Sequence, residues 1–378
     1  MLLDVIRWLI RRERLFRALN PLFGLYNPFL REFRDDPYPI YRRLRENAPV
    51  YRSPVFRAWI CTRHEDVTRV LRDPNFSSDR TSIETNWFQR ALFSSLRPEF
   101  IEAIQRNLLM LDAPDHTRIR NLVNKAFTRR VVDGLRPRIE SQVEELLDAV
   151  EPSGEMNLVR DFASPLPITV IAELLGVPPE DRARFKRWSD DLIALLDPFN
   201  APKGLAGAQD AFGELSVYLR GVFAERRRDP RDDVVSRLLA AEEGGDALTE
   251  AELISTSMII LGAGHETTTK LIGNAVLALL RNPGERKRLR DDPSLVHSAV
   301  EEFLRYDSPV QMTDRVAVED CEIGGKCIRK GQVVVVLLGA ANRDPEVFPD
   351  PDRLDLARPH NPHLSFGQGG HFCLGAQL

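Results

Sequence analysis

Apolar residues recur at helical spacing along much of the chain. In the segment 129–150 they lie three or four positions apart, which predicts an amphipathic helix. Its main apolar positions are Leu135, Ile139, Val143, Leu146 and Val150. The longest such stretch, 250–281, is apolar for most of its length and is therefore expected to form a buried helix. Thr249 and Glu252 have capping-box spacing at its start, and Asn282-Pro283-Gly284 stops it.

Segments rich in β-forming residues are short and few. The segment 50–62 predicts a hairpin that turns at Ser53-Pro54. A short helix is expected within 37–47, and a break between two helical patterns at 198–207. No linker and no internal repeat interrupt the chain. The pattern predicts a mainly α protein with small β-sheets, and the length of the chain allows one large domain or two ordinary ones.

Residues 1–35 are expected to form an N-terminal amphipathic segment. Its first ten residues are apolar but include Asp4 and Arg7, so they are too short and too charged to span a bilayer. No small-residue cleavage site follows, which argues against a secretory signal peptide. We expect a helix packed on its own domain. The alternative is a helix that rests on an anionic membrane surface.

Composition narrows the class of protein. The chain has 378 residues, of which 43% are hydrophobic and 29% charged, as in ordinary globular domains. A net charge of −4 over this length gives no basic footprint, so we expect no nucleic-acid partner. Four cysteines without paired spacing predict no disulfide framework, which favours a cytoplasmic protein. No CxxC or HExxH motif indicates a zinc site.

The stretch 366–375, Phe-Gly-Gln-Gly-Gly-His-Phe-Cys-Leu-Gly, carries the most specific chemistry. Its four glycines let the backbone bend and approach a flat group, and its one cysteine has a histidine and aromatics beside it. A single thiolate ligand to haem iron requires such a loop, because N–H groups of a glycine-rich turn stabilise the thiolate. The alternative, a buried structural cysteine, is what we expect for Cys61, Cys321 and Cys327.

The loop resembles the haem-binding loop of the cytochrome P450 family, Phe-Gly-x-Gly-x-His-x-Cys-x-Gly. Every specified position is matched, by Phe366, Gly367, Gly369, His371, Cys373 and Gly375. The resemblance covers the chain from about residue 36 onward. It implies the cytochrome P450 fold of the soluble bacterial type, as a single large domain over residues 36–378. It also implies haem b as the cofactor and Cys373 as the ligand of the haem iron.

The predicted central helix contains Ala263-Gly264-His265-Glu266-Thr267-Thr268. Glycine weakens a helix and threonine competes for its backbone carbonyls, so this composition calls for a functional explanation. The segment resembles the oxygen-binding groove of the P450 family. The resemblance implies that Glu266 and Thr267 form the acid–alcohol pair that relays protons, and that Ala263 and Gly264 line the groove. His265 and Thr268 are expected to be structural. The alternative is a polar helix face between charges.

Glu302 and Arg305 are three residues apart, so they share a helix face on a helix expected to begin near Ser294. The pair resembles the buried Glu-x-x-Arg of the P450 family, which a second arginine joins from a later loop. That arginine is expected to be Arg353, in Pro351-Asp352-Arg353-Leu354. The role implied for the three residues is structural support of the loop under the haem.

Four residues match the positions that bind the haem propionates in this family, and buried carboxylates need such cationic partners. They are His116 and Arg120, four residues apart on one predicted helix, Arg315 at the opening of the strand 316–318, and His371. A basic cluster of Arg118, Lys125, Arg129 and Arg130 follows the first pair. It is either a docking face for an acidic electron donor or a solvated helix face.

The resemblance implies a haem-thiolate monooxygenase that inserts one oxygen atom from O2 into a C–H or C=C bond of an apolar small molecule. Electrons are expected from NAD(P)H through a ferredoxin or flavodoxin. The alternatives are a peroxygenase that uses hydrogen peroxide and a haem-binding protein without turnover. Neither needs the relay pair Glu266–Thr267. The sequence does not identify the substrate.

Substrate contacts are expected from residues 81–100 and 198–207, from the central helix and from Val310-Gln311-Met312-Thr313. We expect a monomer. The family normally continues past the cysteine loop with a helix and a strand pair, whereas this chain stops at Leu378. The expectation is therefore a C-terminally incomplete P450 domain, with weak haem retention if the protein ends there naturally.

Overall fold

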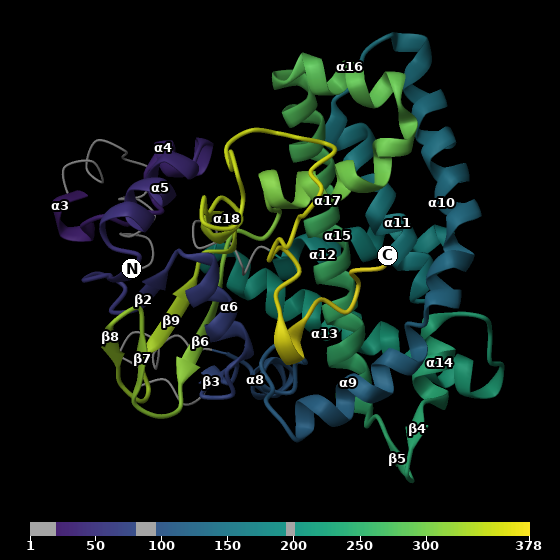
Figure 1. The fold of residues 1–378 in the computed structure, drawn as a ribbon. Coiled ribbons are helices and arrows are strands. Elements are labelled where there is room, and N and C mark those ends of the chain that lie inside the picture. The colour runs from purple at the N-terminus through teal and green to yellow at the C-terminus, as the bar shows by residue number, and fades with distance from the viewer. Residues whose placement is uncertain (1–19, 81–95, 194–200) are drawn as a thin grey trace. The chain divides into compact units, whose positions relative to one another are not determined.

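The computed structural model describes residues 20–80, 96–193 and 201–378 (Figure 1). Contacts divide the chain into two compact units. The sheet unit comprises residues 1–84 and 274–373, and the helical unit comprises residues 85–273 and 374–378. One of the borders between the units, at residues 273 and 274, falls inside the longest helix, α15 (Glu250–Arg281).

A five-stranded sheet with the order β1-β2-β9-β6-β3 organises the sheet unit (Figure 1). In that order the strands are Val50–Arg52, Trp59–Cys61, Val333–Val336, Thr313–Ala317 and Phe76–Ser77. Strands β1 and β2 pair antiparallel and confirm the predicted hairpin. Strand β9 is central, parallel to β2 and antiparallel to β6. Val334 and Val336 of β9 are completely buried, as expected for a run of valines at the centre of a sheet.

Helices and one further hairpin complete the sheet unit. The helices are α3 (Asn20–Phe23), α4 (Arg31–Asp35), α5 (Tyr38–Asn47), α6 (His64–Arg72), α16 (Pro283–Asp291), α17 (Val296–Tyr306) and α18 (Leu338–Ala341). Strand β7 (Cys321–Ile323) pairs with β8 (Lys326–Ile328). Helix α5 confirms the short helix expected there, and it buries Tyr41 and Leu44 against Ile60 of β2.

The helical unit consists almost entirely of helices around one apolar core. They are α8 (Pro98–Gln105), α9 (Asp115–Ala126), α10 (Arg129–Val150), α11 (Pro165–Leu174), α12 (Arg182–Ile193), α13 (Ala201–Arg228), α14 (Val234–Ala240) and most of α15. A π-helical turn, Val159–Ala163, precedes α11, and β4 (Glu242–Glu243) pairs with β5 (Asp246–Ala247). The core includes Phe185, Trp188, Phe223 and Leu261.

Helix α13 begins at Ala201, so the break expected at 198–207 is wrong from that residue onward. Pro202 falls in the first turn of α13, where the missing N–H is one that a helix leaves unpaired anyway. Residues 198–200 lie outside the described residues, as do residues 81–95 of the expected substrate loop and residues 1–19 of the N-terminal segment.

Helix α15 has the predicted boundaries. The Thr249 N–H donates to Glu252 Oε2 at 2.8 Å, and the Glu252 N–H donates to Thr249 Oγ1 at 3.3 Å, which confirms the capping box. The helix ends at Arg281, before Asn282-Pro283. In the part of the chain that the structure describes, no helix combines the length and apolar character needed to cross a membrane.

Candidate active site

The cysteine loop is a series of tight turns whose glycines are required by geometry. The Cys373 N–H donates to the Phe366 carbonyl at 2.8 Å and closes the loop on itself. Gly367 and Gly369 have φ angles of 68° and 71°, in the left-handed region that favours glycine. A Cβ on Gly369 would lie 2.6 Å from the Leu71 carbonyl oxygen of α6, so only glycine allows this close approach.

The loop exposes its cysteine instead of burying it. Cys61 is buried in the sheet unit, and burial raises the pKa of its thiol, as expected for a structural cysteine. Cys373 is exposed, and no disulfide joins it to another cysteine. Cys321 is half-buried and Cys327 is exposed on the β7–β8 hairpin, so the expectation of a buried residue is wrong for Cys327. An exposed sulfur on a fixed turn can coordinate a metal outside the protein core.

The predicted propionate ligands occupy both units. In the sheet unit, His371 Nε2 lies 3.0 Å from Ser78 Oγ, and Arg315 is buried on β6, with its Nη1 donating to the Asp314 carbonyl at 2.8 Å. In the helical unit, α9 carries a buried His116 and a half-buried Arg120 one turn apart. Their role as propionate ligands stays a prediction.

The groove segment of α15 has the side-chain hydrogen bonds to its own backbone that its threonines lead us to expect. Thr267 Oγ1 donates to the Ala263 carbonyl at 2.6 Å, and Thr268 Oγ1 donates to the Gly264 carbonyl at 3.0 Å. Such bonds compete with the helical N–H donors of the same turn. Ala263 is exposed and Thr267 half-buried one turn further on, in a helix otherwise largely buried. This exposed face is where the resemblance places the groove.

Two groove residues have neighbours that the sequence did not indicate. A Cβ on Gly264 would lie 2.5 Å from Ile171 Cδ1, so the lack of a side chain at Gly264 allows Ile171 of α11 to pack closely against α15. The small residue that is exposed is Ala263. The Glu266 carboxylate pairs with Lys270 Nζ at 2.9 Å, and about a third of the Glu266 side chain (34%) is exposed. Glu266 is therefore ion-paired and still in contact with solvent.

The buried Glu302–Arg305 pair is confirmed on α17. Arg305 Nε and Nη2 each donate to a Glu302 oxygen at 2.8 Å, and both side chains are 0% exposed. The expectation that Arg353 joins them is wrong. Arg358 Nε donates to Glu302 Oε2 at 3.0 Å, while Arg353 is exposed and contributes only its carbonyl oxygen, which accepts from Arg305 at 3.1 Å.

The physical reason lies in the backbone around Arg353. Its N–H closes a turn onto the Asp350 carbonyl at 3.0 Å, which directs the Arg353 carbonyl into the network and leaves the side chain outside. Arg358 then reaches back, with its Nη1 also donating to the Pro349 carbonyl at 2.9 Å. No spacing in the sequence distinguishes Arg358 from other arginines, so the sequence does not indicate it.

The basic cluster on α9 and α10 is partly neutralised. Arg118 pairs with the buried Glu252 at the start of α15, and its Nη1 lies 3.2 Å from Asp246 Oδ2. Lys125 Nζ donates to the Glu242 carbonyl at 2.7 Å. Arg118 therefore ties α9 to the start of α15, while the role of the cluster as a docking face stays a prediction.

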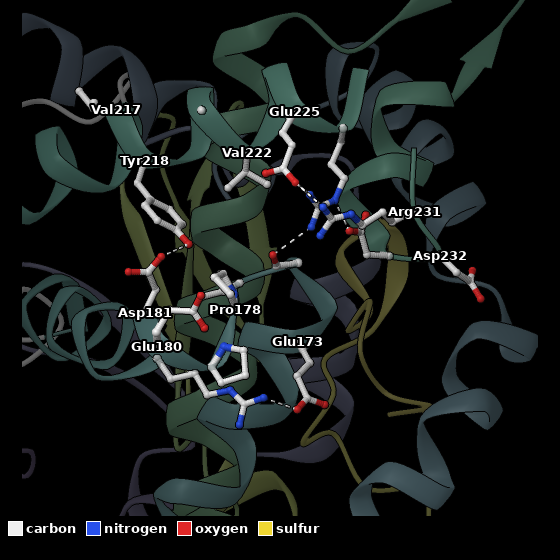
Figure 2. A pocket seen from close by; sticks show the side chains of 17 residues that line it. Glu173, Pro178, Glu180, Asp181, Val217, Tyr218, Val222, Glu225, Arg231 and Asp232 are labelled. Carbon is white, nitrogen blue, oxygen red and sulfur yellow. Dashed lines mark hydrogen bonds and ion pairs between the residues drawn. The ribbon is translucent and has the colours of Figure 1, made fainter. Parts of the chain in front are cut away.

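A surface pocket of about 860 Å³ lies in the helical unit, and none of the predicted site residues lines it (Figure 2). Several polar side chains that line it pair with one another: Tyr218 Oη donates to Asp181 at 2.8 Å, and Arg182 Nη2 to Glu173 at 2.5 Å. Within the described residues, no group of three His, Cys, Asp or Glu side chains could hold a metal ion. A metal bound by the single Cys373 needs a cofactor to supply its other ligands.

Comparison with known proteins identifies the family and, through it, that cofactor. The Cytochrome P450 family model matches residues 57–378. The cytochrome P450 CYP107DY1 of Priestia megaterium is 43% identical over 363 residues, which cover 91% of this chain and 85% of that protein. Vitamin D(3) 25-hydroxylase of Pseudonocardia autotrophica is 42% identical over 352 residues, 92% of this chain and 83% of that protein.

Similarity to solved structures indicates the same family. The crystal structure of P450BioI in complex with acyl carrier protein ligated to hexadec-9Z-enoic acid has a TM-score of 0.84 to this chain at 40% identity, covering 92% of this chain and 88% of that one. The chain therefore belongs to the cytochrome P450 family and has the P450 fold. It is a monooxygenase whose cofactor is haem.

The residues present fit haem. Iron protoporphyrin supplies four ring nitrogens, so the protein has to add one soft or basic ligand, and the exposed Cys373 thiol suits this role. A flat macrocycle also needs small residues beside it, and α15 offers the exposed Ala263.

Proposed function

We propose that this P450 inserts one oxygen atom of O2 into a C–H or C=C bond of an apolar small molecule. The balanced reaction for a C–H bond is RH + O2 + NAD(P)H + H⁺ → ROH + H2O + NAD(P)⁺. The observation that carries the proposal is the exposed Cys373 on a loop closed by its bond to Phe366, in a chain whose longest helix has an exposed Ala263 and a half-buried Thr267 on one face.

Each proposed residue has a role that its contacts allow. Cys373 Sγ would hold the iron as a thiolate. The bound haem supplies the reduction of O2 and the transfer of oxygen, and the protein supplies orientation and protons. Thr267 Oγ1 directs its hydrogen to the Ala263 carbonyl, which leaves its lone pairs to accept a hydrogen bond in the groove. The Glu266 carboxylate, still partly exposed, can exchange protons with solvent.

The substrate class and electron donor rest on resemblance. The names of two similar proteins refer to vitamin D(3) and to hexadec-9Z-enoic acid on a carrier protein, both apolar molecules. An apolar substrate is therefore proposed here. Electrons would come from NAD(P)H through a ferredoxin or flavodoxin. None of the four cysteines forms a disulfide, which suits the reducing cytoplasm that we propose as its location.

Spectroscopy tests the iron ligand first. The ferrous–CO complex should show the red-shifted Soret band of thiolate ligation. Cys373→Ala should abolish that band, while Cys327→Ser, which changes another exposed cysteine, should leave it unchanged. A Soret band without the red shift, or one that survives in Cys373→Ala, contradicts the proposal.

Turnover tests the proton relay and separates the alternatives. With NADPH, a surrogate ferredoxin and its reductase, the protein should dealkylate a reporter such as 7-ethoxycoumarin. Thr267→Ala should lower product formation by about tenfold or more and raise hydrogen peroxide release, since acid–base groups contribute about 10²–10⁴-fold to such reactions. Turnover with peroxide alone, unaffected by Thr267→Ala, would identify a peroxygenase. Tight haem binding without either turnover would identify a non-catalytic haem protein.

A further inference from the structure

Helix α15 has a second polar face, opposite the exposed one. His265 and Thr269 lie one turn apart, so they share a face, and they are only 2% and 9% exposed. Ala263 and Thr267 lie two residues from His265 along the helix, roughly half a turn around its axis. A buried histidine and a buried threonine at the centre of an apolar core need a reason, because polar burial is costly.

Both side chains contact the junction before α11. Thr269 Oγ1 lies 3.1 Å from the Ala163 carbonyl and 3.0 Å from the His265 carbonyl, so its single hydrogen is shared between the two acceptors. His265 Nε2 lies 3.4 Å from Ser164 Oγ. Ala163 ends the π-helical turn and Ser164 precedes α11, so neighbouring residues of that junction receive both contacts.

His265 also reaches a third element. Its Nδ1 lies 3.3 Å from Ser189 Oγ, on α12, and Ser189 is completely buried. Burial lowers the pKa of His265, an effect that Lys186 reinforces and that Asp190 and Glu266 oppose. The ring is therefore neutral at pH 7, with one N–H donor and one acceptor. A serine hydroxyl can serve either nitrogen, so both ring atoms are satisfied.

We propose that His265 and Thr269 are positioning residues for the monooxygenase reaction. Together with Ala163, Ser164 and Ser189 they form a polar anchor that fixes the rotation of α15 at the segment whose threonines bond to its own backbone. The face opposite the anchor then presents Thr267 in one orientation. This inference rests on the proposed function of Thr267, which belongs to the proton relay.

The physical argument is one of geometry. Threonine back-bonding at three successive residues weakens the helical hydrogen bonds of this turn, so the turn has alternatives to its observed shape. Apolar packing does not specify rotation sharply, because it has no direction. Hydrogen bonds to the junction before α11 and to α12 do specify it, since any rotation of α15 leaves buried polar groups unpaired.

The test compares neighbouring threonines. Thr269→Val removes the anchoring hydroxyl and keeps the branched shape. Thr269→Ser keeps the hydroxyl. Thr268→Val removes a hydroxyl from an exposed threonine whose hydrogen bond stays within the helix, and so serves as the matched control. For each variant the ferrous–CO band, the ratio of 7-ethoxycoumarin product to hydrogen peroxide, and amide exchange in residues 263–268 are measured.

In Thr269→Val we expect an unchanged ferrous–CO band, a product-to-peroxide ratio about fivefold lower, equivalent to roughly 1 kcal/mol, and faster amide exchange in residues 263–268. Thr269→Ser should restore the ratio to within about twofold, and Thr268→Val should resemble the parent. The anchor is refuted if Thr269→Val is merely less stable while its folded fraction has the parental ratio, or if Thr268→Val lowers the ratio equally.

Two further measurements keep the test decisive. If Thr269→Val does not fold, Ser189→Ala replaces it, since it deletes one hydroxyl at the edge of the anchor. That variant should lower the ratio by about twofold, and an unchanged ratio contradicts the proposal. If Thr267→Ala itself leaves the ratio unchanged, the proposed relay fails. Amide exchange in Thr269→Val then decides the anchor alone: faster exchange in residues 263–268 supports it, and parental exchange refutes it.

Discussion

Two buried arginines, one in each unit, differ in how far the sequence reveals them. Arg305 in the sheet unit and Arg226 in the helical unit are 0% and 3% exposed. Each pairs with a carboxylate and also donates to backbone carbonyls: Arg305 Nη1 to Asn342 at 2.9 Å, Arg226 Nη2 to Gly176 at 3.1 Å. The resemblance predicts the first as a buried pair. Arg226 lies in a charge run, Arg226-Arg227-Arg228-Asp229 to Asp233, which by its sequence is expected to be a solvated helix end and not a binding site.

The difference lies in where the partner is. Glu302 precedes Arg305 by three residues on the same helix, a spacing that can be recognised in the sequence alone. Asp233, whose Oδ2 lies 2.5 Å from Arg226 Nε, follows the end of α13 and caps α14 through the Ser236 N–H. A run of charged residues in the sequence therefore does not indicate which of its side chains are buried. Tertiary packing decides which of its members has to be paired.

The position of Arg226 also explains why residue 176 is a glycine. Gly176 ends α11 with a φ of 68°, and a Cβ there would lie 2.6 Å from Arg226 Nη2. The Val177 N–H donates to the Ala172 carbonyl at 2.8 Å, which completes the helix end around the left-handed residue. The guanidinium thus joins the ends of α11 and α13 to the start of α14, beside the pocket in which Figure 2 labels Glu225 and Arg231.

The largest effect is expected from Glu302→Ala. It leaves Arg305 and Arg358, which are 0% and 7% exposed, without their shared carboxylate. Removing one partner of a buried ion pair costs about 3–5 kcal/mol, so urea unfolding should show a loss of that size. Haem content should fall too, because the network includes backbone carbonyls of the segment leading to the cysteine loop. A loss below about 1 kcal/mol would show that the network is dispensable.

Arg226→Ala should cost somewhat less, about 2–4 kcal/mol, because Asp233 keeps its bond to the Ser236 N–H and 44% of the Glu225 side chain is exposed to solvent. Unlike Glu302→Ala, it should leave the ferrous–CO band of the folded fraction unchanged. The neighbouring Arg227→Ala is the control, since Arg227 is exposed and should change stability by less than about 0.5 kcal/mol. Equal effects of the two substitutions would mean that the charge run is solvated after all.

What could be predicted from the sequence also depended on whether the interacting residues are near one another in the chain. Local signals sufficed for α15, with its capping box at Thr249 and its stop after Arg281, and for the hairpin of β1 and β2. A recognisable motif sufficed for the loop of Cys373. Contacts between distant segments could not be predicted from the sequence. The anchor at Thr269 depends on a carbonyl 106 residues away, and Arg118 pairs with Glu252 across 134 residues. Neither spacing has a pattern.

The smallest and sharpest difference concerns Arg358 and Arg353, five residues apart in one loop. Arg358→Ala removes a cation from Glu302, but Arg305 and the Asp355 N–H, at 2.9 Å, still bind that carboxylate, so we expect a loss of about 1–2 kcal/mol. Arg353→Ala leaves the network intact, because only the backbone carbonyl of Arg353 takes part, and should stay within about 0.5 kcal/mol of the parent. Urea unfolding of both variants measures the two losses. If Arg353→Ala instead cost more than Arg358→Ala, Arg353 would be the second arginine of the network, as the resemblance to the family predicted. The turn at Asp350 would then not hold the Arg353 side chain outside the network.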